Sequence, residues 1–333
     1  MVKQAFFVVV WMMAVCGLRA QDPVMSQPYA SAMGVNPGFA GITEMPLIHL
    51  SYRNQWPGFN RAYVTYSLDY SQYVDRMHSA FGLELQADNA GRGLFVTTAY
   101  RAFYAYRLEP LPGWYLKLGT YVGGVTNHLA WGRLLFPDDL DEEGNHSGMP
   151  SEWPGRPGIT YLDVGSGLLF YNDRFFAGYS MAHINRPDNR LLDQGAHLYG
   201  GLPIRHSVQL SMRFDLDRQT GHSGRSYFQP YLSWHKQTDF VQWDVDMLLG
   251  FGRFFAGLGI RNTPTGADAA KLMAGFSEGI LKVGYSYDFT ISELTNASAG
   301  SHEVAIILNF DQSARAKKRH SRSYTGDCFD FFR

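Results

Sequence analysis

The sequence predicts an all-β protein: a single transmembrane antiparallel β-barrel of the outer-membrane type, with about fourteen strands. Two observations favour it: long segments in which apolar and polar residues alternate, and connections whose lengths follow a pattern. The composition agrees, because the 333 residues are 15% aromatic and include 35 glycines, which is typical of many strands joined by turns. A soluble β-sandwich is the alternative that the rest of the sequence has to exclude.

Residues 1–20 have the features of a secretory signal peptide. Lys3 precedes an apolar run at 5–15, which is too short to cross a bilayer comfortably, and small Ala20 precedes the expected cleavage point. A retained anchor helix is the alternative. Cleavage would remove Cys16 and leave Cys328, which cannot form an internal disulfide alone. No later run approaches the length of a membrane helix, so a closed barrel is the remaining way to span lipid.

The next segment, 21–46, is irregular in sequence. Its prolines and glycines prevent a long strand or helix. A disordered leader is one interpretation. The other is an ordered segment in the barrel mouth or lumen, because Tyr29 and Phe39 would be costly to leave in water.

The barrel itself is expected over 47–310. Fourteen strand-like segments are predicted there, at 47–54, 61–72, 78–88, 92–108, 114–131, 160–171, 174–183, 204–217, 226–236, 240–249, 252–262, 267–276, 279–289 and 301–310. Most of them reach the roughly 9–11 residues that a membrane strand needs, whereas soluble strands usually have about five or six.

Alternation along these strands gives each one two unlike faces. At 204–215, Val208 and Leu210 share one face while Gln209 and Arg213 share the other. The pattern recurs at 281–289 and 304–310. In a barrel of this size the apolar face meets lipid and the polar face lines the lumen. In a sandwich the polar face would meet water instead.

Connection lengths separate these two architectures. The long connections, about 132–159, 184–203 and 290–300, all follow odd-numbered strands, whereas connections after even-numbered strands are short, apart from 218–225. Long loops at one end and tight turns at the other are typical of outer-membrane barrels. The sequence therefore predicts an outer-membrane protein with both termini in the periplasm and the long loops outside the cell.

We expect no enzymatic activity, no cofactor and no designed metal site. The sequence contains no zinc-protease, P-loop or serine-hydrolase motif, and its histidines are scattered. Acidic residues at 138–143 could bind calcium, but a solvated loop is favoured. Ser207 beside His206 does not indicate a hydrolase, because neighbours on a strand face opposite ways. A net charge of −1 gives no reason to expect a nucleic-acid partner.

Two segments are candidates for binding partner proteins. The first is a turn that is either a hairpin at the membrane interface or a recognition surface, made by Tyr52, Arg53, Asn54, Gln55 and Trp56. The second is the basic, aromatic-ended tail at 311–333, which is either a solvated linker or a periplasmic docking peptide. Its candidate residues are Arg315, Lys317, Lys318, Arg319, Cys328, Phe329, Phe331 and Phe332. Cys328 could also form an intermolecular disulfide.

Several short motifs, spread over nearly the whole mature chain, carry a family resemblance. They are Asp22-Pro23 with Ser26-Gln27, Asn36-Pro37-Gly38-Phe39-Ala40-Gly41, Tyr52-Arg53-Asn54-Gln55-Trp56-Pro57, Tyr63-Val64-Thr65-Tyr66-Ser67, Tyr104-Ala105-Tyr106, Leu135-Phe136-Pro137-Asp138, His183 with Pro187, Gly284-Tyr285-Ser286-Tyr287-Asp288-Phe289 and Gly300-Ser301-His302-Glu303. In this order the chain resembles the PorP/SprF family of outer-membrane proteins of Bacteroidetes-type bacteria. The basic tail with its cysteine departs from the family pattern.

The resemblance implies a barrel of roughly 14 strands that serves type IX protein secretion and gliding motility. It implies a role in the secretion or surface attachment of cargo bearing a C-terminal sorting domain. The implied partners are the type IX translocon, the Por/Gld core complex, a peptidoglycan-linked periplasmic protein, the cargo and outer-membrane lipid. A porin-like or small-molecule transport barrel is the alternative function.

Overall fold

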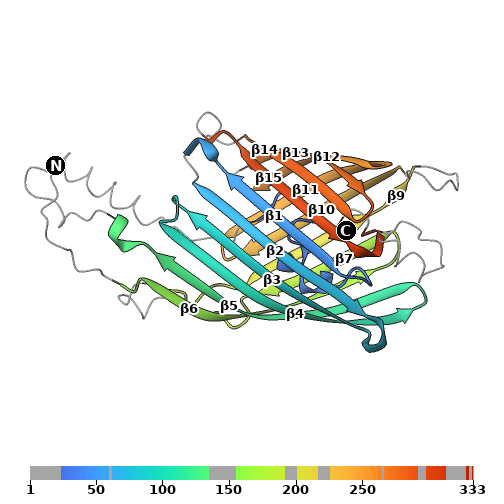
Figure 1. Ribbon diagram of the computed structural model, residues 1–333, viewed down its shortest axis with the longest axis horizontal. Coiled ribbons are helices and arrows are strands. Elements are labelled where there is room, and N and C mark those ends of the chain that lie inside the picture. The colour runs from blue at the N-terminus through green and yellow to red at the C-terminus, as the bar shows by residue number, and fades with distance from the viewer. Residues whose placement is uncertain are drawn as a thin grey trace, which may run out of the picture.

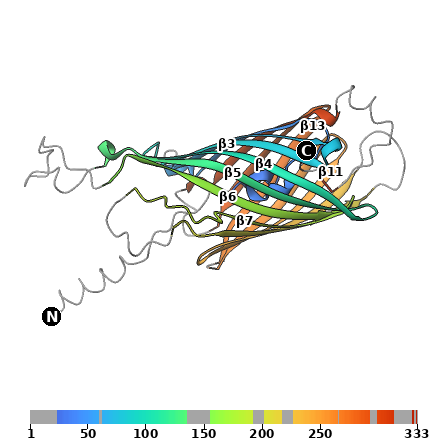
Figure 2. The same ribbon diagram turned by 90° about the horizontal axis from the view of Figure 1, so that it is seen from below.

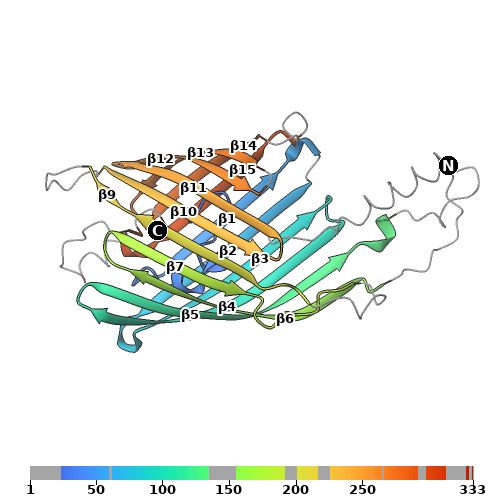
Figure 3. The same ribbon diagram turned by 180° about the vertical axis from the view of Figure 1, so that it is seen from behind.

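The chain forms one closed antiparallel barrel (Figure 1). The computed structural model describes residues 24–59, 62–134, 155–191, 201–216, 226–264, 266–291, 298–312, 328–329 and 332. Apart from the short β9 (Phe214–Asp215), each strand pairs with the strands before and after it in sequence. The first strand, β1 (Leu47–Gln55), pairs antiparallel with the last, β15 (Ser301–Asn309), so the sheet has no free edge. The wall continues without a break around the back of the molecule (Figure 3).

The strands are long, as a membrane-spanning barrel requires. They are β1 (Leu47–Gln55), β2 (Tyr63–Val74), β3 (Ser79–Ala90), β4 (Phe95–Leu111), β5 (Trp114–Leu129), β6 (Gly158–Tyr171), β7 (Phe175–Ala182), β8 (Arg205–Met212), β9 (Phe214–Asp215), β10 (Tyr227–Gln237), β11 (Phe240–Phe251), β12 (Phe254–Thr263), β13 (Gly266–Glu278), β14 (Leu281–Thr290) and β15 (Ser301–Asn309).

The short strand β9 continues β8, because both pair with β10 in one register, from Tyr231↔Ser211 to Tyr227↔Asp215. Counted with β8 and β9 as one strand, the barrel therefore has fourteen strands. The prediction of a fourteen-stranded antiparallel outer-membrane barrel is confirmed, and every predicted strand boundary lies within a few residues of the observed one.

The two faces of the wall differ in polarity. On β14, Lys282, Ser286 and Asp288 point inward and are buried, while Tyr285 and Phe289 point outward and are about half exposed. The outward positions of the other strands are mostly apolar too; Phe254 and Leu258 are 66% and 63% exposed. Polar residues inside and apolar residues outside are the arrangement of a barrel in lipid and the reverse of a soluble sandwich. None of the helices in the described residues is long and apolar enough to cross a membrane.

The connections between successive strands lie alternately at the two rims of the barrel. Tight turns join strands at one rim, here called the turn end; examples are η3 (Asp75–Met77) and the bend at 172–174. The connections 130–157, 183–204 and 291–300 leave the opposite rim, here called the loop end. The chain enters β1 at the turn end and leaves β15 at the same end. Which side of the membrane each terminus occupies stays a prediction.

Residues 24–46, here called the lumen segment, lie inside the barrel. They include α2 (Ala32–Val35) and η1 (Pro37–Phe39), whose dark blue ribbon is enclosed by the strands in Figures 1 and 2. Tyr29, Ala30 and Ala40 are fully buried. Near the end of the chain, Cys328, Phe329 and Phe332 are buried in the same interior cluster. Residues 24–46 and residues 328, 329 and 332 thus both contribute to the contents of the lumen.

Candidate functional site

The lumen is the candidate site, because its wall carries the buried charged side chains and its interior holds the lumen segment. This segment runs along the barrel. At its start, Ser26 contacts wall residues near the loop end of β14 and β15. At its other end, the Met45 amide donates to Asp311, just beyond the turn end of β15 (Met45 N–Asp311 Oδ1, 2.7 Å). The lumen segment therefore extends from the loop-end half of the barrel to its turn end.

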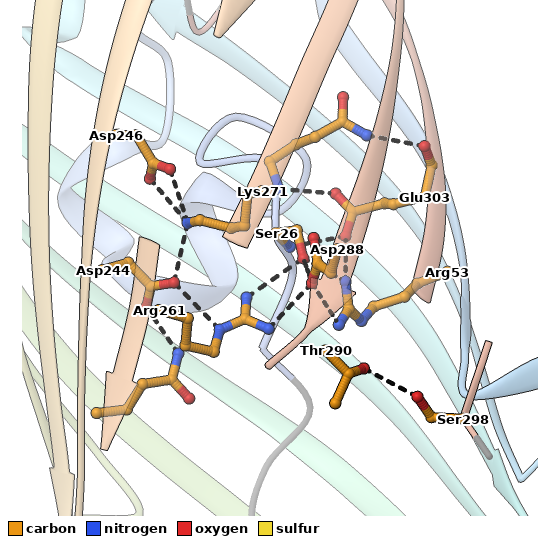
Figure 4. A network of polar contacts seen from close by, with 12 residues as sticks. Ser26, Arg53, Asp244, Asp246, Arg261, Lys271, Asp288, Thr290, Ser298 and Glu303 are labelled. Atoms are coloured by element: carbon orange, nitrogen blue, oxygen red, sulfur yellow. Dashed lines mark hydrogen bonds and ion pairs between the residues drawn. The ribbon is translucent and has the colours of Figure 1, made fainter. Parts of the chain in front are cut away.

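Inward-facing charges form one connected group in the loop-end half, here called the ionic cluster (Figure 4). Its members are Arg53, Asp244, Asp246, Arg261, Lys271, Asp288 and Glu303. All of them are at most about 8% exposed. The ion pairs are close: Arg261 Nε lies 3.1 Å from Asp244 Oδ1, and Lys271 Nζ lies 2.9 Å from the same oxygen.

Strand register explains why these charges meet. Arg53 lies directly opposite Glu303 across the β1–β15 seam. Arg261 lies opposite Asp244, and Lys271 lies opposite Asp288. Directly opposed residues on one face of a sheet have Cβ atoms roughly 5 Å apart, within reach of an ion pair. The period-two pattern thus places opposite charges across neighbouring strands, as a buried ionic group requires.

Gly259 lets two members of the cluster meet across a strand. It stands between Asp246 on β11 and Lys271 on β13 in the register. A Cβ atom at this position would collide with the Asp246 carboxylate and would stand 2.8 Å from Lys271 Cε. With glycine there, Lys271 Nζ reaches Asp246 Oδ2 at 2.9 Å. Because Gly259 has no side chain, Lys271 can contact Asp246 and so join it to the rest of the ionic cluster.

The ionic cluster holds the start of the lumen segment. The Glu303 carboxylate accepts two successive backbone N–H groups, from Ser26 (2.7 Å) and Gln27 (2.9 Å). The Ser26 hydroxyl donates to Asp288 and accepts from Arg53 and Arg261. Glu303 also pairs with Arg53 at 3.2 Å. One carboxylate on the last strand therefore joins the first strand to the lumen segment.

The middle of the lumen segment rests on glycines of the wall. Asn36 Nδ2 donates to the Leu168 carbonyl (3.1 Å) and to Gln209 Oε1 (3.0 Å), while its Oδ1 accepts from the Gly38 amide. Below it, Gly119 and Gly167 oppose each other on β5 and β6. A Cβ atom at Gly119 would collide with the backbone of Pro37 and Gly38, and one at Gly167 would collide with Asn36. Glycine at these positions is needed for the close approach of the two backbones.

Further polar side chains of the wall satisfy the backbone of the lumen segment. Lys117 Nζ donates to the carbonyls of Ala40 and Gly41, the latter at 2.9 Å. Ser51 donates to the Ala30 carbonyl and Ser180 to the Val35 carbonyl, both at 2.7 Å. A buried irregular segment must find such partners because it has no ladder of its own. The contacts come from strands on different sides of the barrel and hold the segment across the lumen.

An aromatic cluster fills the turn-end half of the lumen. Phe39 of the lumen segment packs edge-on against Phe176 of β7, with ring centroids 5.5 Å apart. Phe332 stacks on Phe39 at 5.4 Å, and Phe329 stacks on Phe176 at 5.5 Å. Tyr171 and Tyr231 line the same space. Burying two phenylalanines contributes roughly 3–6 kcal/mol before the ordering of the chain is subtracted.

Two hydrogen bonds orient the end of the chain in this cluster. Gln229 Nε2 donates to the Cys328 carbonyl at 2.8 Å, and the Cys328 thiol donates to the Asn172 carbonyl at 3.1 Å. Cys328 is fully buried. A disulfide to another protein would therefore require these residues to leave the lumen first.

The structure separates the residues predicted as a recognition turn. Arg53 points inward into the ionic cluster, whereas Tyr52 points outward against Tyr66. Trp56 lies beyond the strand at the loop end and packs edge-on against Tyr63. The five residues thus do not form one surface. Arg315, Lys317, Lys318, Arg319 and Phe331 lie outside the described residues, and partner binding by either segment stays a prediction.

The sequence did contain a signal for the ionic cluster. Arg53, Asp288 and Glu303 all stand in the quoted family motifs, and each has the parity of the polar face of its strand. What the sequence could not supply was the residue that each charge contacts.

The described residues contain no arrangement that suggests catalysis. None of their His, Cys, Asp and Glu side chains form a group of three that could hold a metal ion. Ser207 points inward and bonds to His235 Nδ1 at 2.9 Å, whereas His206 points outward and bonds to the Tyr179 hydroxyl. Among the described residues no carboxylate is hydrogen-bonded to His235, so the third member of a hydrolase triad is missing there.

The model of type IX secretion system membrane proteins PorP/SprF matches residues 18–308. The chain belongs to the PorP/SprF family. The prediction of this family is confirmed, and the match covers the lumen segment and almost the entire barrel of this PorP/SprF protein. No curated protein sequence gives a significant match.

Solved structures with detectable similarity to this PorP/SprF barrel include porins. A mutant of Rh. blastica porin is 11% identical, with a TM-score of 0.34, and the alignment covers 79% of this chain and 98% of that one. A triple mutant of Rhodopseudomonas blastica porin is 9% identical, with a TM-score of 0.32 and the same coverage. At these scores the superposition carries no argument about function.

The first prediction concerns Glu303. Replacing it by alanine removes the buried acceptor of two backbone amides and one of the two carboxylates that pair with Arg53, so we expect Glu303→Ala to lower the free energy of unfolding by about 3–5 kcal/mol. Urea unfolding in lipid vesicles measures this, and hydrogen exchange reports the loosening of 24–31. The matched control is Glu278→Ala, which removes a carboxylate from a surface pair with Arg253 and should cost about 0–1 kcal/mol. Equal losses in the two variants would contradict the role assigned to Glu303.

The second prediction concerns Gly119. The added methyl groups of Gly119→Val would push against the backbone of Pro37 and Gly38 and displace the middle of the lumen segment, at a cost of about 1–3 kcal/mol. Hydrogen exchange of residues 36–41 should then rise, while the heat-dependent gel mobility of a folded barrel is kept. Leu118→Val, at the adjacent outward position, is the control and should leave that exchange unchanged. Unchanged exchange in Gly119→Val would disprove the contact.

Proposed function

We propose that this PorP/SprF protein is a non-enzymatic outer-membrane scaffold of the type IX secretion system and not an open channel. It supports the secretion or surface attachment of cargo that bears a C-terminal sorting domain. Its turn end faces the periplasm, where it contacts the Por/Gld core complex and a peptidoglycan-linked protein. The translocon, the cargo and outer-membrane lipid are its other partners.

The observation that supports this proposal most is the filled lumen. The lumen segment crosses the barrel from the loop-end half to the turn end, and the aromatic cluster occupies the turn-end half. Two cavities beside the lumen segment have volumes of about 10 Å³ and 30 Å³. One water molecule needs about 10–15 Å³ of such volume, so these two cavities have room for only a few water molecules. A porin needs a continuous aqueous path.

A filled barrel still offers two kinds of contact surface. The long connections at the loop end are suited to cargo or translocon, because outer-membrane barrels carry their recognition loops on that rim. The turn end carries the start of the tail, whose basic residues would contact an acidic or phosphate-bearing periplasmic partner. These assignments rest on the family and on segment placement.

The channel alternative is tested by conductance. We expect the purified protein in planar bilayers to give no large, steady currents, because buried hydrogen bonds to the wall hold the lumen segment in place. A bacterial porin reconstituted in the same bilayer is the positive control. Gly119→Val serves as a second control, since displacing the lumen segment should produce openings. Steady porin-like currents from the unmodified protein would overturn the scaffold proposal.

The secretion role is tested in cells. In a strain that produces the protein without residues 313–333, cross-linking and affinity purification should recover fewer periplasmic partners, with the translocon still present. In a strain that lacks the protein, cargo with a C-terminal sorting domain should accumulate in the periplasm or be released unattached. Normal cargo at the cell surface in that strain would refute the secretion role, and unchanged partners of the shortened chain would refute the role of the tail.

A further inference from the structure

A second group of inward-facing charges lies on the strands β1 to β4. Register places Asp69 of β2 directly opposite Glu84 of β3. His49 of β1 is the next residue on one side of them, and Arg101 of β4 is the next on the other. Asp69 and Glu84, here called the carboxyl pair, are only 3% and 1% exposed. Like charges directly opposite each other destabilise a sheet, so two ionised carboxylates are not expected here.

The positive charge near the carboxyl pair lies on the side of Glu84. Arg101 Nη1 is 3.1 Å from Glu84 Oε2, and Arg101 Nε is 3.5 Å from Asp163 Oδ2. Asp69 Oδ1 accepts from the Ser67 hydroxyl at 3.0 Å. In the described part of the chain, no ion pair joins Asp69 to a lysine or an arginine. A buried carboxylate without a cation is costly, so Asp69 needs another source of positive charge.

The hydrogen-bonding groups around Asp69 indicate that a donor is missing. Asp69 Oδ2, Glu84 Oε1 and His49 Nε2 are buried and have no hydrogen-bond partner among the described residues. Glu84 Oε1 faces α2 of the lumen segment, because a Cβ atom at Gly34 would stand 2.7 Å from it. An ionised carboxylate can only accept hydrogen bonds, whereas a protonated one also donates. A proton on Asp69 would therefore supply a donor to neighbours that can accept.

The space beside Asp69 favours a proton over a metal ion. A cavity of about 10 Å³ adjoins Asp69 and His49, which is room for roughly one water molecule. Apart from Ser71, the rest of its lining is apolar: Ala32, Met33, Phe39, Ile42 and Leu47. Metal ions need several oxygen or nitrogen ligands. Among the described residues, no three His, Cys, Asp or Glu side chains are grouped to supply them.

Other charged and titratable side chains lie around the carboxyl pair. His49 faces Lys282 of β14 across Ile307, so a positive charge on its ring would lie near a second one. Residues 32–35 of α2 carry no titratable side chain. The groups that face the pair from the surrounding elements are His49, Lys282, Arg101, Asp163, His183, and Arg205, which donates to the Gly34 carbonyl.

We propose that the carboxyl pair is a proton-binding site, in which Asp69 Oδ2 carries one proton at neutral pH. The proton forms the O–H bond of a carboxylic acid and leaves the pair with one negative charge, on Glu84, beside Arg101. Asp69 then donates to the acceptors next to it. The lumen segment thus rests on a bound proton at α2, whereas ion-paired carboxylates hold its start at Ser26. This inference does not depend on which secretory role the barrel has.

Infrared difference spectroscopy of the full-length protein in lipid vesicles tests the proton directly. The spectrum of the wild type minus that of Asp69→Asn should show the C=O band of a carboxylic acid at neutral pH, and this band should shift in D₂O. The control is Asp75→Asn, because the Asp75 side chain is 77% exposed at the turn end. Its difference spectrum should show an ionised carboxylate. An ionised carboxylate in the Asp69→Asn difference spectrum as well would overturn the proposal.

Urea unfolding compares the two members of the pair. Asparagine imitates a protonated aspartate, so Asp69→Asn should change the unfolding equilibrium constant by less than about threefold. Glu84→Gln removes a carboxylate that pairs with Arg101 and should raise the constant by at least about tenfold. A loss in Asp69→Asn as large as that in Glu84→Gln, or a failure of Asp69→Asn to fold, would contradict a proton on Asp69.

Hydrogen exchange tests the link to the lumen segment. In alkaline solution the wild type should lose the proton, and two negative charges would then face α2. Residues 31–35 should therefore exchange faster in the wild type than in Asp69→Asn at the same alkaline pH, and at equal rates at neutral pH. Equal rates in both solutions would show that the proton does not support the lumen segment and would overturn that part of the proposal.

Discussion

The interior of this barrel depends on charge pairing across neighbouring strands. Every inward-facing carboxylate or cation in the ionic cluster has lost its water, and a charge in that state is tolerated only beside an opposite one. Register supplies the partner in most cases, as between Arg53 and Glu303 or between Arg261 and Asp244. Carboxylate oxygens of these pairs also accept hydrogen bonds from the lumen segment, as Glu303 does from the Ser26 and Gln27 amides. The position of the lumen segment thus depends on the charged side chains of the wall.

The segment and the wall are complementary in shape as well as in charge. Opposite Pro37 and Asn36 of the lumen segment, the wall carries Gly119 and Gly167, which have no side chain to collide with them. Where the lumen segment turns, the long side chain of Lys117 extends from the wall and donates to the carbonyls of Ala40 and Gly41. A barrel whose lumen conducted solutes would have no need of such matched pairs.

The wall was more predictable from sequence than the interior. Period-two alternation and connection lengths were sufficient for strand number and approximate bounds, because both depend on local geometry. The same parity puts Arg53 on one face of β1 with His49 and Ser51, although we predicted Arg53 as part of a recognition turn. It could not reveal that Glu303, some 250 residues later, would be opposite Arg53. That contact depends on barrel closure, which no local pattern encodes. The end of the chain was ambiguous for another reason: an aromatic peptide such as Cys328 to Phe332 packs equally well on a partner or on its own barrel.

Glu303 belongs to the last strand to be synthesised, yet its carboxylate accepts the backbone amides of Ser26 and Gln27, more than 270 residues earlier in the chain. Before β15 arrives, Ser26 and Gln27 have no carboxylate to accept their amides, and Arg53 faces a half-built wall. Sealing the β1–β15 seam and securing the lumen segment are therefore one cooperative event. A chain that closed with the segment outside would keep the ion pair between Arg53 and Glu303 but would lose the contacts of Glu303 with the Ser26 and Gln27 amides, so the closed seam and the lumen segment stabilise each other.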